Sequence, residues 1–420
     1  MQHSLDVNGR HGADPYRWIV LGAATFSQAS AAFVTQGLAV LAGFIQTGLQ
    51  LSAFQVGLLF TASTLMPLFT LLFVGNLLDY RSERSIICGG SLLMGGGLAL
   101  AWGASGFVSL LLALLLIGAG YSTIQPGGSR SVSGWFAEGE LGLAMGVRQA
   151  GLPLGGALAG MFIPLAIHDG NWRAAFVLCL IVVTFGGCAF YRLYRRPRFA
   201  PGLSVRQALS IALVRGLVAQ AWLQRLTVLG VVMVAIQYGV VVNLMLYLRD
   251  VQHIPLARGA GMLALSQLCG GMGRIGLAAL GDRLAGSGGR HVPLNLCFGA
   301  AALGLVCLLL LPAGTSMSVL FVLSAWLGFF AMGWYGPWVA CIAHAAPKEM
   351  LGLTLGVAMA LNQLAIVVTP PLLGKLHDLT RHYWPVWLVL LAAQCVAWAG
   401  IRRLAGTARD AGRAGAGALE

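Results

Sequence analysis

The sequence predicts an all-α membrane protein with twelve transmembrane helices in two six-helix halves. Hydrophobic residues make up 58% of the 420 residues and charged residues only 9%, against roughly 25% charged residues in a typical soluble domain. The apolar residues gather in uncharged tracts near the ~20 residues that a helix needs to cross a bilayer. These tracts are far longer than the ~10-residue alternating strands of a β-barrel. Helices are therefore expected.

Apolar tracts bounded by charged or Gly/Pro-rich breaks delimit the expected spans. They are 18–45, 54–78, 86–104, 107–135, 141–167, 174–193, 226–248, 260–280, 292–311, 319–343, 351–373 and 385–401. Ser52 and Gln55 form a capping-box pattern that opens the second span. Pro255 suits the start of the eighth span, and Pro153 among small residues predicts a kink and close packing in the fifth.

Two segments repeat after about 200 residues, which indicates two halves related by a parallel repeat. GNLLDYRSER after the second span is echoed by AALGDRLAGSGGR after the eighth, and GLAMGV in the fifth by GLTLGV in the eleventh. The far ends of these spans repeat as His168-Asp169 and His377-Asp378. The expected organisation is an N-tail (1–17), a first half (18–193), a linker (194–225), a second half (226–401) and a C-tail (402–420). Residues 203–218 of the linker are amphipathic and are expected on the membrane surface.

Basic residues in short loops predict the orientation in the membrane. Of the 26 lysines and arginines, eighteen fall on the side of the termini and the linker, five on the other side, and three inside spans. The positive-inside rule then places both termini in the cytoplasm of a multi-pass plasma-membrane protein, the inner membrane in a Gram-negative cell. The net charge of +13 is explained in this way, and no nucleic-acid partner is expected.

The motifs of common enzyme and metal sites are missing from the sequence. The eight cysteines lie in apolar tracts without C-x-x-C spacing, so we interpret them as packing residues. No P-loop, metal-ligand spacing or Ser/His/Asp arrangement stands out. The N-terminus has no apolar core before a cleavage site, so no removable signal peptide is expected. We expect neither an enzyme nor a bound cofactor.

The repeated loop segments resemble the cytoplasmic loop motif of the major facilitator superfamily. The first copy matches at Gly75, Leu77, Asp79, Arg81 and Arg84, and departs from the motif at Leu78, Tyr80 and Glu83; the second copy keeps Asp282, Arg283 and Arg290 but has Ala278 at the leading glycine. The resemblance implies alternating access between two rocking halves. It also implies a gating motif of Gly75, Asp79, Arg81, Arg84, Asp282 and Arg283, in which Asp79 faces the start of the eleventh helix near Gly352.

Three arginines, Arg130, Arg148 and Arg274, fall inside the expected spans, where each costs ~2.5–3.5 kcal/mol to insert. All thirteen acidic residues fall in tails, loops or span ends, so we expect no carboxylate at mid-membrane to neutralise them. This pattern favours an anionic substrate. Arg274 also resembles the substrate arginine in the eighth helix of monocarboxylate and oxalate/formate carriers, and Arg130 resembles a fourth-helix arginine with a structural or proton-coupling role. Helix-end carbonyls or headgroups are the alternative partners of all three.

The expected substrate-binding residues combine these arginines with polar residues of the spans. They are Arg274, Arg148, Arg130, Gln28, Gln237, Tyr238, Asn243, Tyr335 and Asn362. The predicted function is secondary active transport of a small organic anion, a carboxylate, across the inner membrane by a monomer in the lipid bilayer. The alternatives are a drug or siderophore efflux pump with an apolar cavity, and a sensor or scaffold without transport. A proton on the substrate or on His344, or a second anion in exchange, are the candidate coupling modes.

Overall fold

A computed structural model describes residues 14–136, 138–167, 171–196, 211–284, 289, 291–346 and 351–416, and this part of the chain forms helices without any strand. The first half contains α1 (Tyr16–Leu49), α2 (Ala53–Tyr80), α3 (Glu83–Trp102), α4 (Phe107–Tyr121), α5 (Ile124–Ser133), α6 (Glu138–Phe162) and α7 (Ala174–Leu193). The second half contains α9 (Ala221–Asp250), α10 (Leu256–Leu284), α11 (Val292–Leu310), α12 (Met317–Leu327), α13 (Tyr335–Ala345), α14 (Leu351–Thr380) and α15 (Trp384–Ala416). Between them lies α8 (Ile211–Val218).

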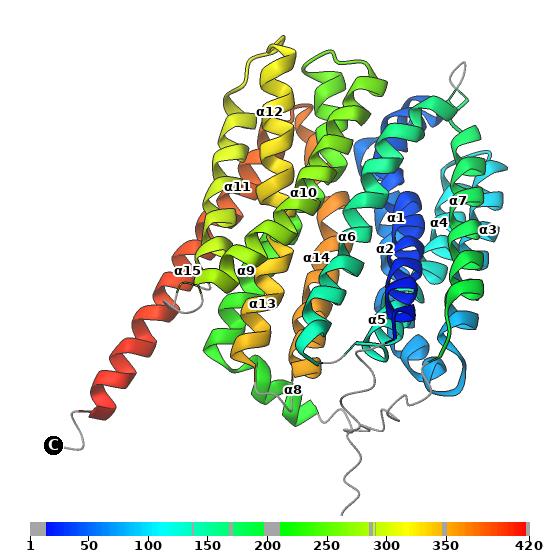
Figure 1. Cartoon of the computed structure of the whole chain (residues 1–420). Coiled ribbons are helices and arrows are strands. Elements are labelled where there is room, and N and C mark those ends of the chain that lie inside the picture. The colour runs from blue at the N-terminus through cyan, green and yellow to red at the C-terminus, as the bar shows by residue number, and fades with distance from the viewer. Residues whose placement is uncertain are drawn as a thin grey trace, which may run out of the picture.

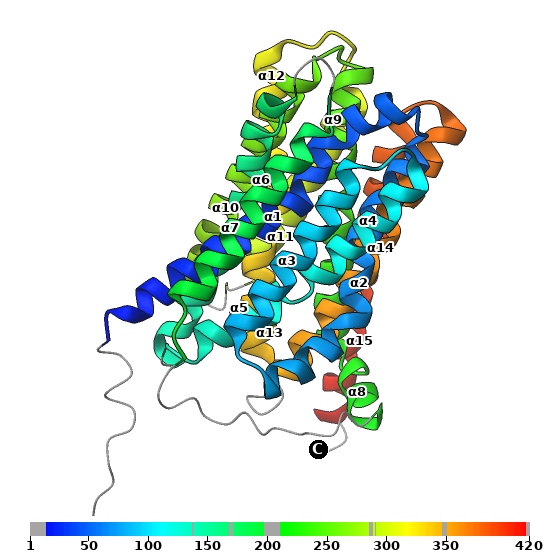
Figure 2. The same ribbon diagram turned by 90° about the vertical axis from the view of Figure 1, so that its right-hand side faces the viewer.

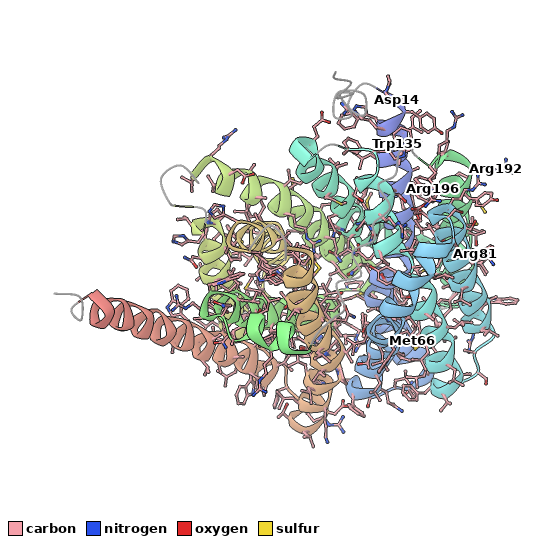
Figure 3. The ribbon with its side chains drawn as sticks, turned by 90° about the horizontal axis from the view of Figure 1, so that it is seen from below. Asp14, Met66, Arg81, Trp135, Arg192 and Arg196 are labelled. Carbon is pink, nitrogen blue, oxygen red and sulfur yellow. The ribbon has the colours of Figure 1, made fainter. Side chains whose placement is uncertain are left out.

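Eleven helical segments in the described residues are long and apolar enough to cross a membrane, and Trp384–Gly400 is a shorter apolar helix. The all-α, multi-pass fold is therefore confirmed, while the count of twelve stays a prediction. Helix α1 begins and α15 ends on one face of the molecule, here called the terminal face (Figures 1 and 2). The short α8 also lies there (Figure 1). From below, the two halves stand side by side (Figure 3).

Two of the expected spans are not continuous α-helices. The fourth is divided into α4 and α5 by turn residues at Ser122 and Thr123. The tenth is divided into α12, a π-helix (Gly328–Met332) and α13. Both breaks lie in Gly-rich sequence, one followed by Pro126, and proline cannot donate an intrahelical hydrogen bond. Each region still forms one segment long and apolar enough to cross a membrane, Phe107–Ser133 and Met317–Ile342, so the two expected spans are confirmed, although neither is a continuous α-helix.

Helix ends extend the apolar tracts and agree with the capping chemistry. Ser52 accepts a hydrogen bond from the backbone N–H of Gln55, and the Gln55 side chain accepts from that of Ser52, so the expected capping box is confirmed. Pro255 precedes α10 and its carbonyl accepts the first helical hydrogen bonds, so the proline is a cap rather than a first-turn residue. Helix α14 runs past its expected end at residue 373 to Thr380 and carries polar residues to the face opposite the termini, here called the opposite face.

The antiparallel pair α2 and α14 joins the two halves from the opposite face to the middle of the molecule. The Oγ1 of Thr61 donates to the carbonyl of Val367 (2.6 Å), and one helical turn further the Nε2 of Gln363 donates to the carbonyl of Thr64 (2.7 Å). Nearer the opposite face, Gly57 lies directly against the Pro370 backbone, where any Cβ would come within 2.6 Å of its carbonyl oxygen. The halves are thus in intimate backbone contact on this side.

The pair α6 and α10 makes a second junction at the same level. A Cβ on Gly156 would meet the amide of Gln267, and one on Gly271 would meet the Pro153 ring. The Nε2 of Gln267 also donates to the Oε1 of Gln36 on α1 (3.0 Å), and both side chains are buried. These contacts and those of α2 with α14 all lie between the middle of the molecule and the opposite face.

Candidate functional site

Arg148 lies in the interior of the first half, and its side chain is 0% exposed. Its Nη2 donates to the Oε1 of Gln28 (3.2 Å), to the carbonyls of Ile124 (3.2 Å) and Gln125 (2.9 Å), and to the Oε1 of Gln125 (3.0 Å). Its Nε and Nη1 have no hydrogen-bond partner among the described residues. The break between α4 and α5 thus anchors one end of the guanidinium group and leaves a buried charge with unused donors.

The missing side chain of Gly128 makes room for this guanidinium group. A Cβ at residue 128 would lie 2.6 Å from the Nε, 2.9 Å from the Nη2 and 3.1 Å from the Cζ of Arg148. All three distances are shorter than an ordinary van der Waals contact of about 3.5–4.0 Å. Only glycine at this position of α5 allows Arg148 to reach the carbonyl groups at the helix break.

Arg274 occupies a related environment in the second half. Its Nε donates to the carbonyl of Met332 (3.1 Å), the last residue of the π-helix, and its Cζ lies 5.3 Å from the centroid of the Tyr335 ring. A guanidinium group over an aromatic face at this distance is a cation–π contact. Gly273 allows α10 to approach the π-helix closely, since any Cβ at this position would clash with the Phe329 carbonyl. Each half therefore anchors one buried arginine on the carbonyls of its broken fourth span.

The two arginines lie at nearly the same depth. Pro153 of α6 faces Gly271 of α10, and these helices run antiparallel. Arg148 lies five residues from Pro153 and Arg274 three residues from Gly271, both toward the terminal face. At 1.5 Å per residue these offsets are about 4.5–7.5 Å. The two arginines thus lie at a similar depth, on the terminal side of the junction between the halves.

Tyrosines from both halves lie near these charges. Tyr335 of the second half interacts electrostatically with Arg148 as well as with Arg274, and Tyr121 of the first half does the same. Tyr238 interacts with Arg274 and lies beside Gln36. The site therefore spans the boundary between the halves. Tyr121 and Gln125 escaped the sequence analysis, although a tyrosine and a glutamine flanking a Gly/Pro-rich break in an uncharged tract were the available signal.

Arg130 is placed differently from the other two arginines. Its Nε lies 3.2 Å from the Oε1 of Glu83, the first residue of α3, and the carboxyl group is 5% exposed. Burial and Glu83 together raise the pKa of the nearby Tyr194 phenol, which stays protonated. The expectation that no carboxylate neutralises the three arginines is therefore wrong for Arg130. Glu83 lies at a span end, but the fold buries it beside α5.

The expected amide residues have different surroundings. Gln237 accepts a hydrogen bond from the Nε1 of Trp334 (3.0 Å), and the Nδ2 of Asn243 donates to the carbonyl of Gly239 in its own helix (2.9 Å). Asn362 is 4% exposed, and neither its Oδ1 nor its Nδ2 has a partner in the described structure. Buried amide groups are normally hydrogen-bonded, so Asn362 is the one of these three with unused capacity.

The expected gating motif lies at the terminal face. Arg81, Arg84, Asp282 and Arg283 are exposed, and the Cζ of Arg84 lies 5.1 Å from the centroid of the Tyr191 ring. The surroundings of Gly75 and the side chain of Asp79 are not described, and His168 and Asp169 lie outside the described residues. The contact between Asp79 and the start of α14 therefore stays a prediction.

Comparison with known proteins decides the family. Residues 24–370 match the model of the Major Facilitator Superfamily. The chain belongs to this superfamily. A crystal structure of a bacterial homologue of the human lysosomal transporter Spinster, inward-facing and unoccupied, superposes with a TM-score of 0.79 at 15% identity and covers 94% of this chain and 98% of that one. A nucleoside transporter superposes with a TM-score of 0.76 at 10% identity and covers 92% and 99%. These two likenesses confirm the fold.

Relatives by sequence are also membrane transporters, so the expectation of a transporter rather than an enzyme is confirmed. An uncharacterised transporter of this superfamily from Mycobacterium tuberculosis (strain CDC 1551 / Oshkosh) is 27% identical over 379 residues, 88% of this chain and 81% of the relative. A probable galactarate/D-glucarate transporter of Bacillus subtilis (strain 168) is 23% identical over 394 residues, 86% and 85%. The hexuronate transporter of the same organism is 32% identical over 150 residues, 34% of each chain. Several relatives of this superfamily transporter are thus transporters of acid sugars.

Proposed function

We propose that this protein is a secondary active transporter of a small organic anion, a hydroxylated carboxylate of the sugar-acid class. One observation carries the proposal: Arg148 and Arg274, one from each half, lie at one depth beside shared tyrosines. Guanidinium groups bind carboxylates through charge-assisted hydrogen bonds. Ionisable groups inside membrane-spanning segments are costly and mark substrate or ion pathways. Neither Arg148 nor Arg274 has a carboxylate partner among the described residues. An anionic substrate would compensate the charge of both.

Buried amide groups among the expected binding residues support a hydroxylated rather than an apolar acid. Asn362 and the Nε2 of Gln28 are buried without partners among the described residues. An unsatisfied buried amide costs about 1–3 kcal/mol, and substrate hydroxyl groups would recover this free energy. The names of the relatives, which include hexuronate and galactarate/D-glucarate transporters, point to the same substrate class.

The arrangement of the halves supports alternating access. The contacts of α2 with α14 and of α6 with α10 close the space between the arginines and the opposite face. The arginines lie on the terminal side of these contacts. We propose that the terminal face is cytoplasmic, as the distribution of basic residues predicts, and that parting of these helix pairs exposes the arginines to the other side of the membrane.

Uptake into proteoliposomes tests the proposal. Labelled galacturonate, galactonate and galactarate are compared with neutral galactose, for the wild type, Arg148→Ala, Arg274→Ala and the exposed control Arg258→Ala. We expect uptake of at least one acid but not of galactose. Loss of a charged hydrogen bond worth about 1.5–3 kcal/mol predicts a roughly 10- to 100-fold lower kcat/KM for each interior variant and no change for the control.

Two results would contradict the proposal. The first is acid uptake at wild-type rates in both interior variants, which would remove the arginines from the site. The second is proton-dependent export of hydrophobic cations from dye-loaded vesicles, with no acid transported, which would favour the drug-efflux alternative. Acid uptake in the wild type together with its loss in only one variant would retain the substrate class and assign the carboxylate to that arginine.

A further inference from the structure

A carboxylate of the second half holds the first half at the opposite face. Asp378, in the last turn of α14, accepts hydrogen bonds from the backbone N–H groups of Ala53 (2.9 Å) and Phe54 (2.8 Å), the first two residues of α2. The first four N–H groups of an α-helix have no acceptor within the helix. The positive end of the helix dipole also favours a carboxylate. Asp378 therefore completes the N-terminus of a helix that belongs to the other half.

A second contact between the halves lies beside the first. The Nη2 of Arg249, near the end of α9, donates to the Oε1 of Gln46 on α1 (2.8 Å), and its Nη1 donates to the carbonyl of Gly43 (3.4 Å). The same guanidinium group donates to the carboxylate of Asp250 through its Nε (2.5 Å). Arg249 thus reaches across to the first half while its own counterion stays in α9.

Tyr383 and His377 connect the two contacts within the second half. The hydroxyl of Tyr383 donates to the Oδ2 of Asp250 (2.9 Å), and the Tyr383 ring lies 4.3 Å from that of His377. The Nδ1 of His377 lies 3.9 Å from the Oδ1 of Asp378. Burial and the neighbouring Asp250 raise the pKa of the Tyr383 phenol, so it remains a hydrogen-bond donor. The charged groups around Asp378, including Arg381, form one network on a single half.

This distribution of charge allows the two halves to part without dividing an ion pair between them. In the two contacts described, the second half supplies every formal charge and the first half supplies backbone groups and one neutral amide. When the halves part, Arg249 keeps Asp250, and the freed N–H groups of α2 meet water at the membrane surface. An ion pair divided between the halves would instead have to be broken each time they part, at a cost of about 0.2–1 kcal/mol for an exposed pair.

The same two helices have a second aspartate at their other end. Thr64 of α2 lies opposite Gln363 of α14. From this pair, Asp79 lies fifteen residues toward the terminal face along α2, and Leu351 lies twelve residues in the same direction along α14. Asp79 is thus within one helical turn of the level at which α14 starts. In this antiparallel pair, Asp378 thus lies at the N-terminus of α2, and Asp79 lies near the level of Leu351, the first described residue of α14.

We propose that Asp378 is a gating residue that holds the opposite face closed, as the counterpart of Asp79 at the terminal face. Breaking the Asp378 contact with α2 accompanies opening at the opposite face, and the Asp79 contact with α14 forms in that state. The two aspartates therefore stabilise opposite conformations through the same helix pair. This inference rests on the alternating access of the proposed function but not on the identity of the substrate.

Accessibility of a cysteine below the gate tests this role without any substrate. Gln36→Cys places a thiol in the buried junction between α1 and α10. Intact cells that carry this substitution are treated with a membrane-impermeant maleimide, and labelling of Cys at residue 36 is followed by peptide mass spectrometry. Asp378→Asn keeps the size of the side chain but removes its charge. Lys375→Gln, an exposed position on the same helix, is the control.

We expect Asp378→Asn to raise the labelling rate about tenfold, as loss of a charged cap in a partly buried site implies, and Lys375→Gln to leave it unchanged. Asp79→Asn should lower the rate, and the double variant should return it toward that of the background. Labelling of Asp378→Asn at the background rate, with the protein expressed and folded, would overturn the proposal. So would an equal increase in Lys375→Gln. A failure to transport any organic acid would contradict the proposed function alone, because labelling does not depend on it.

Discussion

Gly128→Ala offers a sharp test of the site, because it displaces Arg148 without removing its charge. The added Cβ would lie 2.6 Å from the Nε of Arg148, at least about 0.9 Å inside ordinary van der Waals contact. The guanidinium group is far more easily moved than the backbone of α5, so it is the group that shifts. Its hydrogen bonds to Ile124 and Gln125, now 2.9–3.2 Å, would lengthen beyond useful range.

The expected magnitude follows from these contacts. Hydrogen bonds to a charged group contribute about 1.5–3 kcal/mol each. Loss of one such bond between the displaced Arg148 and the substrate carboxylate predicts a roughly 10- to 100-fold rise in the KM for the transported acid. Uptake by proteoliposomes over a range of acid concentrations measures this rise. The lost hydrogen bonds of a buried charge also lower the thermal unfolding midpoint in detergent, so KM is compared at a temperature at which the variant is folded.

Gly146→Ala is the matched control for this substitution. Gly146 lies on α6 close to Arg148, and a Cβ there would meet nothing within 4 Å. Alanine in a helix interior is favoured over glycine by roughly 0.5–1 kcal/mol, so this variant should transport normally with equal or higher stability. A wild-type KM in Gly128→Ala, in a protein that is folded by the same measure, would refute the assignment of Arg148 to the substrate site.

Three further predictions concern the same contacts. Gln125→Glu places a carboxylate where the Nη2 of Arg148 already has a partner at 3.0 Å; we expect acid uptake to fall at least tenfold in proteoliposomes while Gln125→Leu retains more activity, and equal loss in both would argue against neutralisation. Glu83→Gln removes the charge of the carboxylate that lies 3.2 Å from the Nε of Arg130, and loss of one partner of a buried pair costs up to about 3–5 kcal/mol; a thermal midpoint equal to that of the wild type would contradict this role of the pair. Gly374→Ala adds a Cβ that would overlap the Ala53 carbonyl and its neighbours; in the Gln36→Cys background, maleimide labelling from outside should increase, and unchanged labelling would mean that this backbone contact does not hold the face closed.

Apolar tract length predicts the membrane helices well, because a helix must satisfy its own backbone groups in hydrocarbon. It does not predict where such a helix breaks. The turns at Ser122 and Thr123 and the π-helix Gly328–Met332 lie inside uncharged tracts, and the arginines that bind the neighbouring carbonyls come from other helices. The local sequence shows which residues are apolar, whereas the side chains that bind the backbone beside a helix break depend on how the helices pack.

The arginines show the same division between sequence and structure. The cost of burying a guanidinium group singled out Arg130, Arg148 and Arg274 without any coordinates. The sequence distance between Arg130 and Glu83 hid their pairing, since α3 and α5 approach each other only in the folded half. Asp378 was recognised as one copy of a repeated His-Asp pair, but its hydrogen bonds to α2 join residues more than 300 positions apart.

By itself, the sequence determined the all-α membrane class, the repeat of two halves, the superfamily and the presence of costly positive charge within the spans. These properties follow from composition, periodicity and local motifs, because each residue must suit the hydrocarbon or the water that surrounds it. Only the tertiary structure decided which arginine is paired, which two share a depth across the halves, and which carboxylate closes the opposite face. Those outcomes depend on contacts between helices remote in sequence, and the free energy of such contacts is set by packing geometry that no local pattern records.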